Sequence, residues 1–263
     1  MAGPRDAEAL LRATLGIQEA DLRSSYVAHV VRTVSASHRP AFAEMLDELC
    51  RRAESMDDAA REFVLTLSDV ASRSDTTEEV QRLREEAAGG ALLSLERALR
   101  LPPPSPVGRS LPPRTTRPPD YGFGRPVTLG ERKSLARRPT REMIERLLND
   151  PHPDVIRRLL GSPRLVEEDV LRLAAKRPGR PDVLAEISRS PKWIHRSRVR
   201  MAVLLNPDTP PAVAAALSSV LLRQELTFVV RSPRVPRSIR ALCLERLRMR
   251  PPMPPPPSKS PIQ

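Results

Sequence analysis

A basic stripe in the last third of the chain carries the residues best suited to binding chemistry. Cationic side chains recur there every three or four residues, with further basic residues between them: Arg189, Lys192, His195, Arg196, Arg198 and Arg200. No Asp or Glu lies between Glu186 and Asp208. Guanidinium groups at this density suit phosphates, or the carboxylates of an acidic protein drawn in by electrostatic attraction.

Three interpretations of this stripe remain open. It holds an acidic protein partner, it contacts the phosphates of a nucleic acid, or it is an ordinary solvated face. Composition supports the last, because 40 of the 44 Lys and Arg residues are Arg and the chain is rich in Ala and Pro, as in a GC-rich bacterial genome. Nucleic acid is disfavoured because the stripe lacks interleaved aromatic rings that stack on bases and matches no helix-turn-helix pattern.

Few aromatic residues are available to anchor a partner or a core. Trp193 is the only tryptophan and lies inside the stripe. Packed between helices it is a core residue, whereas on a concave face it would anchor a partner. Tyr121 and Phe123 stand just before the repeat described below, and we expect them to cover its open end.

No catalytic or metal-binding pattern is present in the sequence. The histidines form no spaced pair: His29, His38, His152 and His195. Cys50 and Cys243 belong to no CxxC pair or Cys/His cluster, so neither a zinc site nor a disulfide is indicated. No GxSxG motif or glycine-rich phosphate loop occurs. We therefore expect a protein that is not an enzyme and that uses no cofactor or metal.

Charge divides the chain into two parts. Residues 1–100 carry 13 Arg against 18 Asp and Glu, a net charge of −5, whereas residues 101–263 carry 31 basic against 14 acidic residues, a net charge of +17. Such an asymmetry indicates two functional units. It also predicts that the acidic part can dock on the basic part and mask it.

Residues 1–100 are predicted to form an acidic helical bundle. Apolar residues make up 40% of the chain but aromatic residues only 3%, which suits helix-on-helix packing better than a sheet. One buried helix face follows the i, i+3, i+4, i+7 spacing through Phe42, Met45, Leu46 and Leu49. The Gly89-Gly90 pair is expected to break the last helix of the bundle.

Two proline-rich segments flank the basic part. Residues 101–127 are predicted to be a linker, because their first 20 residues read LPPPSPVGRSLPPRTTRPPD and show no apolar period. Polyproline II would make them a semi-rigid spacer. Residues 251–263, PPMPPPPSKSPIQ, are predicted to be a disordered tail. Either segment could be a ligand for an aromatic groove, but a plain tether is the simpler interpretation.

A repeat closed by proline runs through residues 128–250. An apolar residue stands four positions before each of seven prolines: Pro139, Pro151, Pro163, Pro178, Pro191, Pro207 and Pro233. Proline disfavours the α conformation in the residue before it, so each helix must stop there. A second proline two to three residues on, as at Pro153, Pro181, Pro210 and Pro236, suits the first turn of the next helix. Between Pro207 and Pro233 one such proline is missing.

These marks leave room for helices of roughly two to three turns, which are too short to be stable alone. They must stack on their neighbours as an α-solenoid. The repeat reads LLNPDTPPAVAAAL at 204–217, NDPHPDVIRRLLGSP at 149–163 and KRPGRPDVLAEISRSP at 176–191. These segments resemble the HEAT-like and leucine-rich-repeat-variant repeats of bacteria, a resemblance that covers about 128–250.

The resemblance implies a binding function, because these families mostly mediate binding. HEAT-like DNA glycosylases are a remote alternative, since they use a basic concave face with a few carboxylate and aromatic side chains. Asp169 and Trp193 would take those roles here. No catalytic residue of the family can be matched to this chain.

We therefore expect an all-α protein with an N-terminal bundle and a basic solenoid. The expected function is a non-enzymatic scaffold that holds an acidic protein in the solenoid groove or at its Arg-rich edge. Nucleic-acid binding through residues 189–200 is the alternative. No signal-peptide pattern and no run of about 18 apolar residues occurs, so we expect a cytoplasmic protein without a membrane span.

Overall fold

The computed structural model describes residues 6–100 and 117–249, and these residues form helices joined by loops. The fold is 72% helical, and no strand occurs in the described ranges, which confirms the predicted all-α class for them. Within the same ranges, none of the helices combines the length and the apolar character needed to cross a membrane. Of the predicted proline-rich segments, 101–116 and 251–263 lie outside the described residues.

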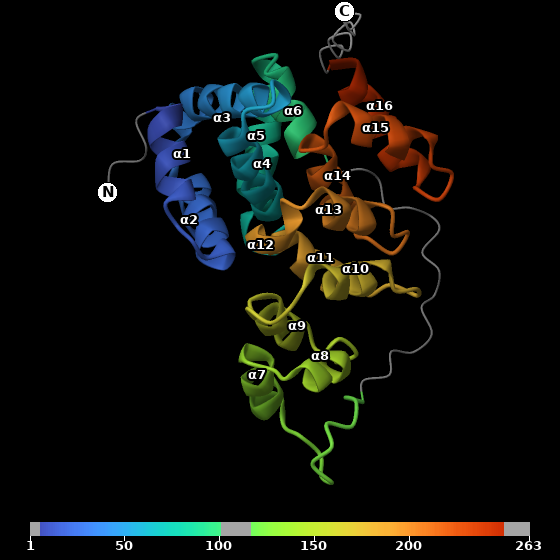
Figure 1. The fold of residues 1–263 in the computed structure, drawn as a ribbon. Helices are drawn as coiled ribbons and strands as arrows, with labels where there is room; N and C mark the ends of the chain where they lie inside the picture. The colour runs from blue at the N-terminus through green and yellow to red at the C-terminus, as the bar shows by residue number, and fades with distance from the viewer. Residues whose placement is uncertain (1–5, 101–116, 250–263) are drawn as a thin grey trace, which may run out of the picture.

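The first part of the chain is a bundle of six α-helices around one apolar core (Figure 1). The helices are α1 (Ala7–Leu15), α2 (Ala20–Thr33), α3 (Arg39–Glu54), α4 (Asp58–Ala71), α5 (Thr77–Gly89) and α6 (Leu93–Leu99). The face predicted from its spacing is buried in α3, where Leu46 and Leu49 are fully enclosed. As expected, α5 ends at Gly89, before Gly90 and the start of α6.

The second part is an array of ten α-helices that runs from green to red in Figure 1. They are α7 (Leu129–Arg137), α8 (Arg141–Leu147), α9 (Pro153–Leu160), α10 (Glu167–Ala175), α11 (Pro181–Arg189), α12 (Pro191–Ile194), α13 (Ser197–Leu204), α14 (Pro211–Ser219), α15 (Arg223–Arg231) and α16 (Arg237–Met249). Helices two places apart in the chain pack together, as α7 does on α9 and α9 on α11.

Proline ends the helices of the array where the sequence predicts. For example, α9 stops at Leu160 before Pro163, and α10 stops at Ala175 before Pro178. Pro153 and Pro181 are the first residues of α9 and α11, where a missing N–H costs nothing. Pro210 and Pro236 instead stand one residue before their helices, since α14 begins at Pro211 and α16 begins at Arg237.

Two boundaries in the array have no proline, the one between α12 and α13 at His195-Arg196 and the one between α14 and α15. Helix α14 ends at Ser219 and α15 begins at Arg223. Glu225 marks this start instead, because its carboxylate accepts a hydrogen bond of 2.7 Å from the backbone N–H of Leu222. A side chain from the first turn therefore caps the helix.

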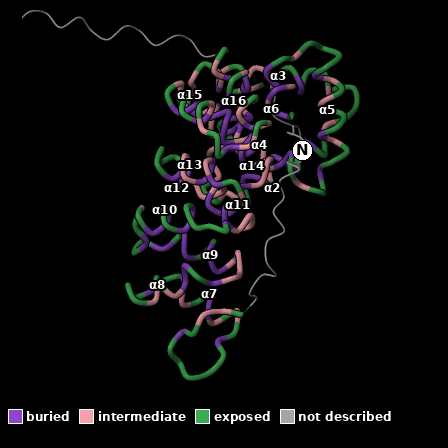
Figure 2. The backbone as a smooth tube through the Cα atoms, turned by 90° about the vertical axis from the view of Figure 1, so that its right-hand side faces the viewer, coloured by how far each residue is buried: buried purple, intermediate pink, exposed green. Residues whose placement is uncertain are grey.

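The array encloses a continuous apolar core. It is built from small and medium aliphatic side chains, and most of the residues that stand four positions before the repeat's prolines are buried in it: Leu147, Leu159, Ala174, Ile187, Val203 and Val229. Figure 2 shows buried segments in purple inside the stack, with exposed segments in green at the loops and along the helices. The predicted apolar positions therefore support the packing of one helix on the next.

The bundle and the array contact each other over an extended interface. Helix α4 packs along α14, and Leu65 of α4 joins the apolar core of the array. At the far end, Arg100 pairs with Glu245 of α16 at 3.0 Å. Arg246 is buried there and donates hydrogen bonds to Ser218 Oγ at 3.0 Å and to the carbonyl of Arg97 at 3.4 Å.

Candidate functional site

Residues 189–200 do not lie on one helix. They span the end of α11, the four-residue α12 and the first turn of α13. Two breaks in the helical path, at Ser190 and at His195-Arg196, turn the chain between them. The three- and four-residue spacing of the basic stripe therefore does not place its side chains along one helix face.

Trp193 belongs to the core. Its side chain is only 1% exposed, and its indole N–H donates a hydrogen bond of 2.7 Å to the carbonyl of Leu160 in α9. The ring is flanked by two cations, with Lys192 Nζ 4.5 Å and Arg196 Cζ 5.1 Å from its centroid. Of the two roles considered for this residue, the structure shows the packed one, with cation–π contacts at its rim.

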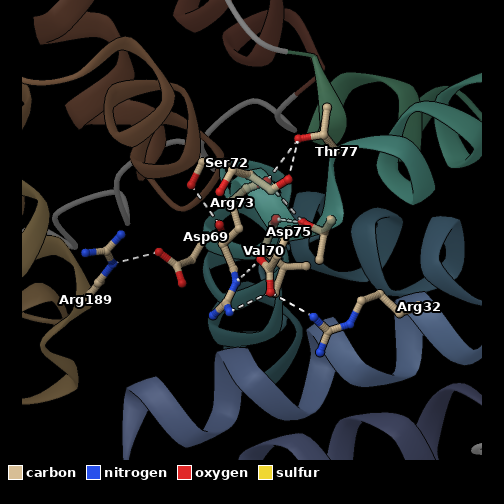
Figure 3. Close-up of polar contacts among 10 residues, drawn as sticks. Arg32, Asp69, Val70, Ser72, Arg73, Asp75, Thr77 and Arg189 are labelled. Carbon is tan, nitrogen blue, oxygen red and sulfur yellow. Dashed lines mark hydrogen bonds and ion pairs between the residues drawn. The ribbon is translucent and has the colours of Figure 1, made fainter.

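Two members of the stripe are held in ion pairs with limited exposure. Arg189 contacts Asp69 of α4 at 2.7 Å, as Figure 3 shows, and Glu186 at 3.2 Å. The nearby carboxylate of Asp69 raises the pKa of Arg189 against the opposing effect of burial. Arg200 is buried and contacts Glu225 at 2.7 Å. Both residues stabilise packing between helices.

The remaining stripe residues are exposed but also have internal contacts. Arg196 pairs with Glu167 at 2.6 Å, and Arg198, which is 65% exposed, pairs with Glu168 at 2.9 Å. Lys192 donates to the carbonyl of Ser162 at 2.9 Å, and burial lowers its pKa. Surface pairs such as those of Arg196 and Arg198 contribute little free energy, so a partner's carboxylates can replace the internal ones.

His195 faces the bundle across the interface. Its Nε2 lies 3.9 Å from Glu62 Oε1 of α4. The side chains of His195 and Arg23 stabilise the carboxylate of Glu62 and lower its pKa to about 2. Glu62 is therefore ionised at neutral pH and adds a second acid-to-base contact beside Asp69–Arg189.

The residues considered for glycosylase-like chemistry lie inside the fold. Asp169 is fully buried, caps the backbone N–H of Val166 at 3.2 Å and binds Arg141 and Arg172. Burial acts to raise its pKa, but the hydrogen bonds from the two arginines outweigh burial and lower the pKa to about 2. Asp169 therefore serves as a helix cap, and Trp193 as a core residue.

The two aromatic residues before α7 differ in their surroundings. Tyr121 is buried in the core of the array, and its hydroxyl donates to the buried carboxylate of Asp150, which also binds Arg132 at 2.7 Å. Phe123 is 52% exposed. Tyr121 therefore covers the first helices of the array, while Phe123 does not.

The arginines that have no internal partner lie outside the predicted stripe. Within the described residues, the side chains of a set of exposed arginines in the array make no hydrogen bond or ion pair: Arg137, Arg138, Arg158, Arg231, Arg234, Arg237 and Arg248. The last four lie on α15, on α16 or in the loop between them, and the same two helices carry the exposed apolar side chains of Phe228 and Leu244. The excess of positive charge on α15 and α16 is visible in the sequence, because no acid lies between Glu225 and Glu245.

A cleft opens between the start of the bundle's second helix and the array. One wall is the segment from Gln18 to Asp21, which comprises the end of the α1–α2 loop and the start of α2. The other wall carries cations from α7, α9, α11 and α12: Lys133, Arg137, Arg157, Arg158, Arg189 and Lys192. Asp21 and Arg157 bridge the two walls at 3.3 Å.

The cysteines and acids offer no metal centre in the part of the chain that the structure describes. No group of three or more His, Cys, Asp or Glu side chains there could hold a metal ion. Cys50 and Cys243 are buried free thiols, and burial raises the pKa of Cys243 to about 12. A thiol that stays protonated at neutral pH is a poor nucleophile.

No family model, no curated protein and no solved structure matches this chain.

Proposed function

We propose that the chain is a non-enzymatic scaffold whose array is a HEAT-like α-solenoid that holds an acidic protein partner. Support for the solenoid comes from the spacing of contacts between its helices. Arg141 pairs with Asp169, 28 residues on, and Arg157 pairs with Glu186, 29 residues on. Such a near-constant separation fits stacked two-helix units of about 28 residues, in which each proline-closed segment is one helix.

The observation that carries the binding proposal is the positive charge left on the array after its internal ion pairs are formed. The unpartnered arginines lie at both ends of the array, on α7 and α9 and on α15 and α16. Arginine forks bind carboxylates in a bidentate manner and keep their charge at all physiological pH values. An acidic protein would therefore be steered to this surface and held there.

The bundle supports the same assignment, because it already behaves as an acidic ligand of the array. Asp69 binds Arg189, and Asp21 binds Arg157. We propose that the bundle masks these two arginines and leaves the arginines at the two ends of the array for a separate partner.

Affinity capture with the full chain, followed by mass spectrometry, tests the scaffold. We expect wild type to retain a protein with an acidic surface, and the charge reversals Arg196→Glu/Arg198→Glu or Arg234→Glu/Arg237→Glu to lose it. The matched control is Arg12→Glu/Arg82→Glu, which makes the same charge change on the bundle and should retain it.

Two results would contradict the scaffold. Capture that disappears after nuclease treatment would assign the basic surface to nucleic acid. Equal retention by wild type and both array variants would show that the arginines on the array do not hold the captured protein.

A further inference from the structure

The cleft between the bundle and the array has two walls of opposite character. The wall formed by Gln18–Asp21 presents Glu19 and Asp21, and the array wall presents six cations from the four helices α7, α9, α11 and α12. Two of the array's carboxylates, Asp154 and Glu186, also line it. The cations therefore outnumber the carboxylates in the cleft, six to four.

Two of the six cations in the cleft have side chains without a partner among the described residues. Arg157 is fully engaged, since it contacts Glu186 at 2.8 Å as well as Asp21. Lys133 contacts Asp154 at 2.5 Å. Arg137 and Arg158 are exposed and have no hydrogen-bond or ion-pair partner in the described ranges.

The ion pair between Asp21 and Arg157 indicates that carboxylates are the kind of group that the array wall can bind. Asp21 reaches Arg157 from the opposite wall, and its side chain is 58% exposed, so this contact is open to exchange. A carboxylate from the bundle already takes the position that a carboxylate from a partner would take. Arg137 and Arg158 offer further positions of the same kind beside it.

We propose that this cleft binds an acidic peptide segment of a protein partner through Arg137, Arg157 and Arg158, in competition with Asp21. This inference rests on the proposed scaffold function and gives it a defined site. None of the described residues that line the cleft is Trp, Tyr or Phe, so they offer no surface on which bases could stack. Glu19 and Asp21 on the facing wall would also repel a continuous phosphate backbone, whereas a peptide can place its acids on one side only.

Fluorescence anisotropy with the full chain and a labelled peptide of ten Asp and Glu residues tests the site. We expect Arg137→Glu/Arg158→Glu to weaken binding at low salt by about tenfold or more, because two attractive contacts become repulsive. Arg12→Glu/Arg82→Glu makes the same charge change on the bundle, outside the cleft, and should alter affinity by less than about twofold, since distant exposed charges are screened.

Removal of the competing carboxylate should have the opposite effect. Asp21→Asn frees Arg157 on the cleft side, and we expect it to tighten peptide binding by about two- to fivefold, the value of one exposed ion pair. Asp58→Asn, which changes charge equally at an exposed position on α4, should leave the affinity unchanged. The substituted side chains are exposed, so circular dichroism should show wild-type helix content in every variant.

Three outcomes would overturn the proposal. Equal loss of affinity in the Arg12/Arg82 control would reduce the binding to non-specific charge attraction. Equal peptide affinities of Asp21→Asn and Asp58→Asn would show that Asp21 does not compete with the peptide for Arg157. A duplex oligonucleotide that binds more tightly than the peptide, and that depends on Arg137 and Arg158, would assign the cleft to nucleic acid. A protein captured through Arg196 or Arg234 would leave the scaffold standing even if the cleft failed.

Discussion

Several side chains that are functional candidates in the sequence instead stabilise the fold. Arg189, Arg200 and Asp169 each have an obvious role in a binding or catalytic hypothesis, yet each pairs inside the fold. The sequence could not predict this, because Asp69 lies 120 residues before Arg189. Pairings within a few residues are visible in a sequence, whereas those between stacked helices depend on the fold.

Asp169 provides the clearest test at the residue scale. Asp169→Ala removes a helix cap and leaves Arg141 and Arg172 without their shared carboxylate, so we expect a loss of about 2 kcal/mol in the free energy of unfolding. Glu168→Ala, at the exposed neighbouring position, should change it by less than about 0.5 kcal/mol. Urea unfolding followed by the fluorescence of Trp193 measures both. Equal stability of the two variants would refute the capping role.

The pKa of Asp169 adds a pH dependence to this prediction. Because its pKa falls on folding from 3.8 to about 2, its stabilising effect is present above pH 4 and is lost as the pH falls toward 2. The stability difference between wild type and Asp169→Ala should therefore shrink over that range. A difference that stays constant down to pH 2 would contradict the assigned pairing.

Two features define where the short helices of this chain begin and end, proline residues and a capping glutamate. Proline stops helices such as α9 and α10 before Pro163 and Pro178, and these ends are predictable because the rule acts on the adjacent residue. The start of α15 is not marked by proline, and Glu225 caps it while binding the buried Arg200. A glutamate in a sequence does not reveal that it will be buried, so this boundary escaped prediction.

The role of Glu225 at the start of α15 can be tested by substitution. Glu225→Gln keeps the shape of the side chain but leaves Arg200 buried without an opposite charge, and we expect a loss of about 3 kcal/mol in stability. Arg231→Gln, on the exposed side of the same helix, should cost less than about 0.5 kcal/mol. Thermal unfolding by circular dichroism compares the two, and similar midpoints would show that the Arg200–Glu225 pair does not stabilise α15.

The whole molecule is an array with a bundle fixed to its side. Opposite net charges predicted contact between the two parts, but they could not predict that an apolar residue joins them. Leu65 lies on α4 at the edge of the bundle's buried face and packs into the core of the array. Arg246 is enclosed between the two parts. Removal of residues 1–100 would expose both surfaces, so point variants are the better probes of this contact.

We expect the two parts to unfold as one cooperative unit. Leu65→Ala, a change in the bundle, should lower the midpoint of thermal unfolding reported by Trp193 in the array by about 5 °C. Leu22→Ala, at an exposed position of α2, should leave it unchanged. A Trp193 transition that is insensitive to Leu65→Ala would show that the two parts fold independently.

The position of the bundle gives the molecule uneven stiffness. Its contacts with α12, α14 and α16 brace the C-terminal part of the array at several points. The segment from α7 to α10 projects beyond this brace, and an ion pair between Asp21 and Arg157 ties it to the bundle. We therefore expect bending to concentrate in that segment, with α11 as the pivot. Such bending would open and close the gap spanned by Asp21 and Arg157, and higher ionic strength should ease it by screening this exposed pair.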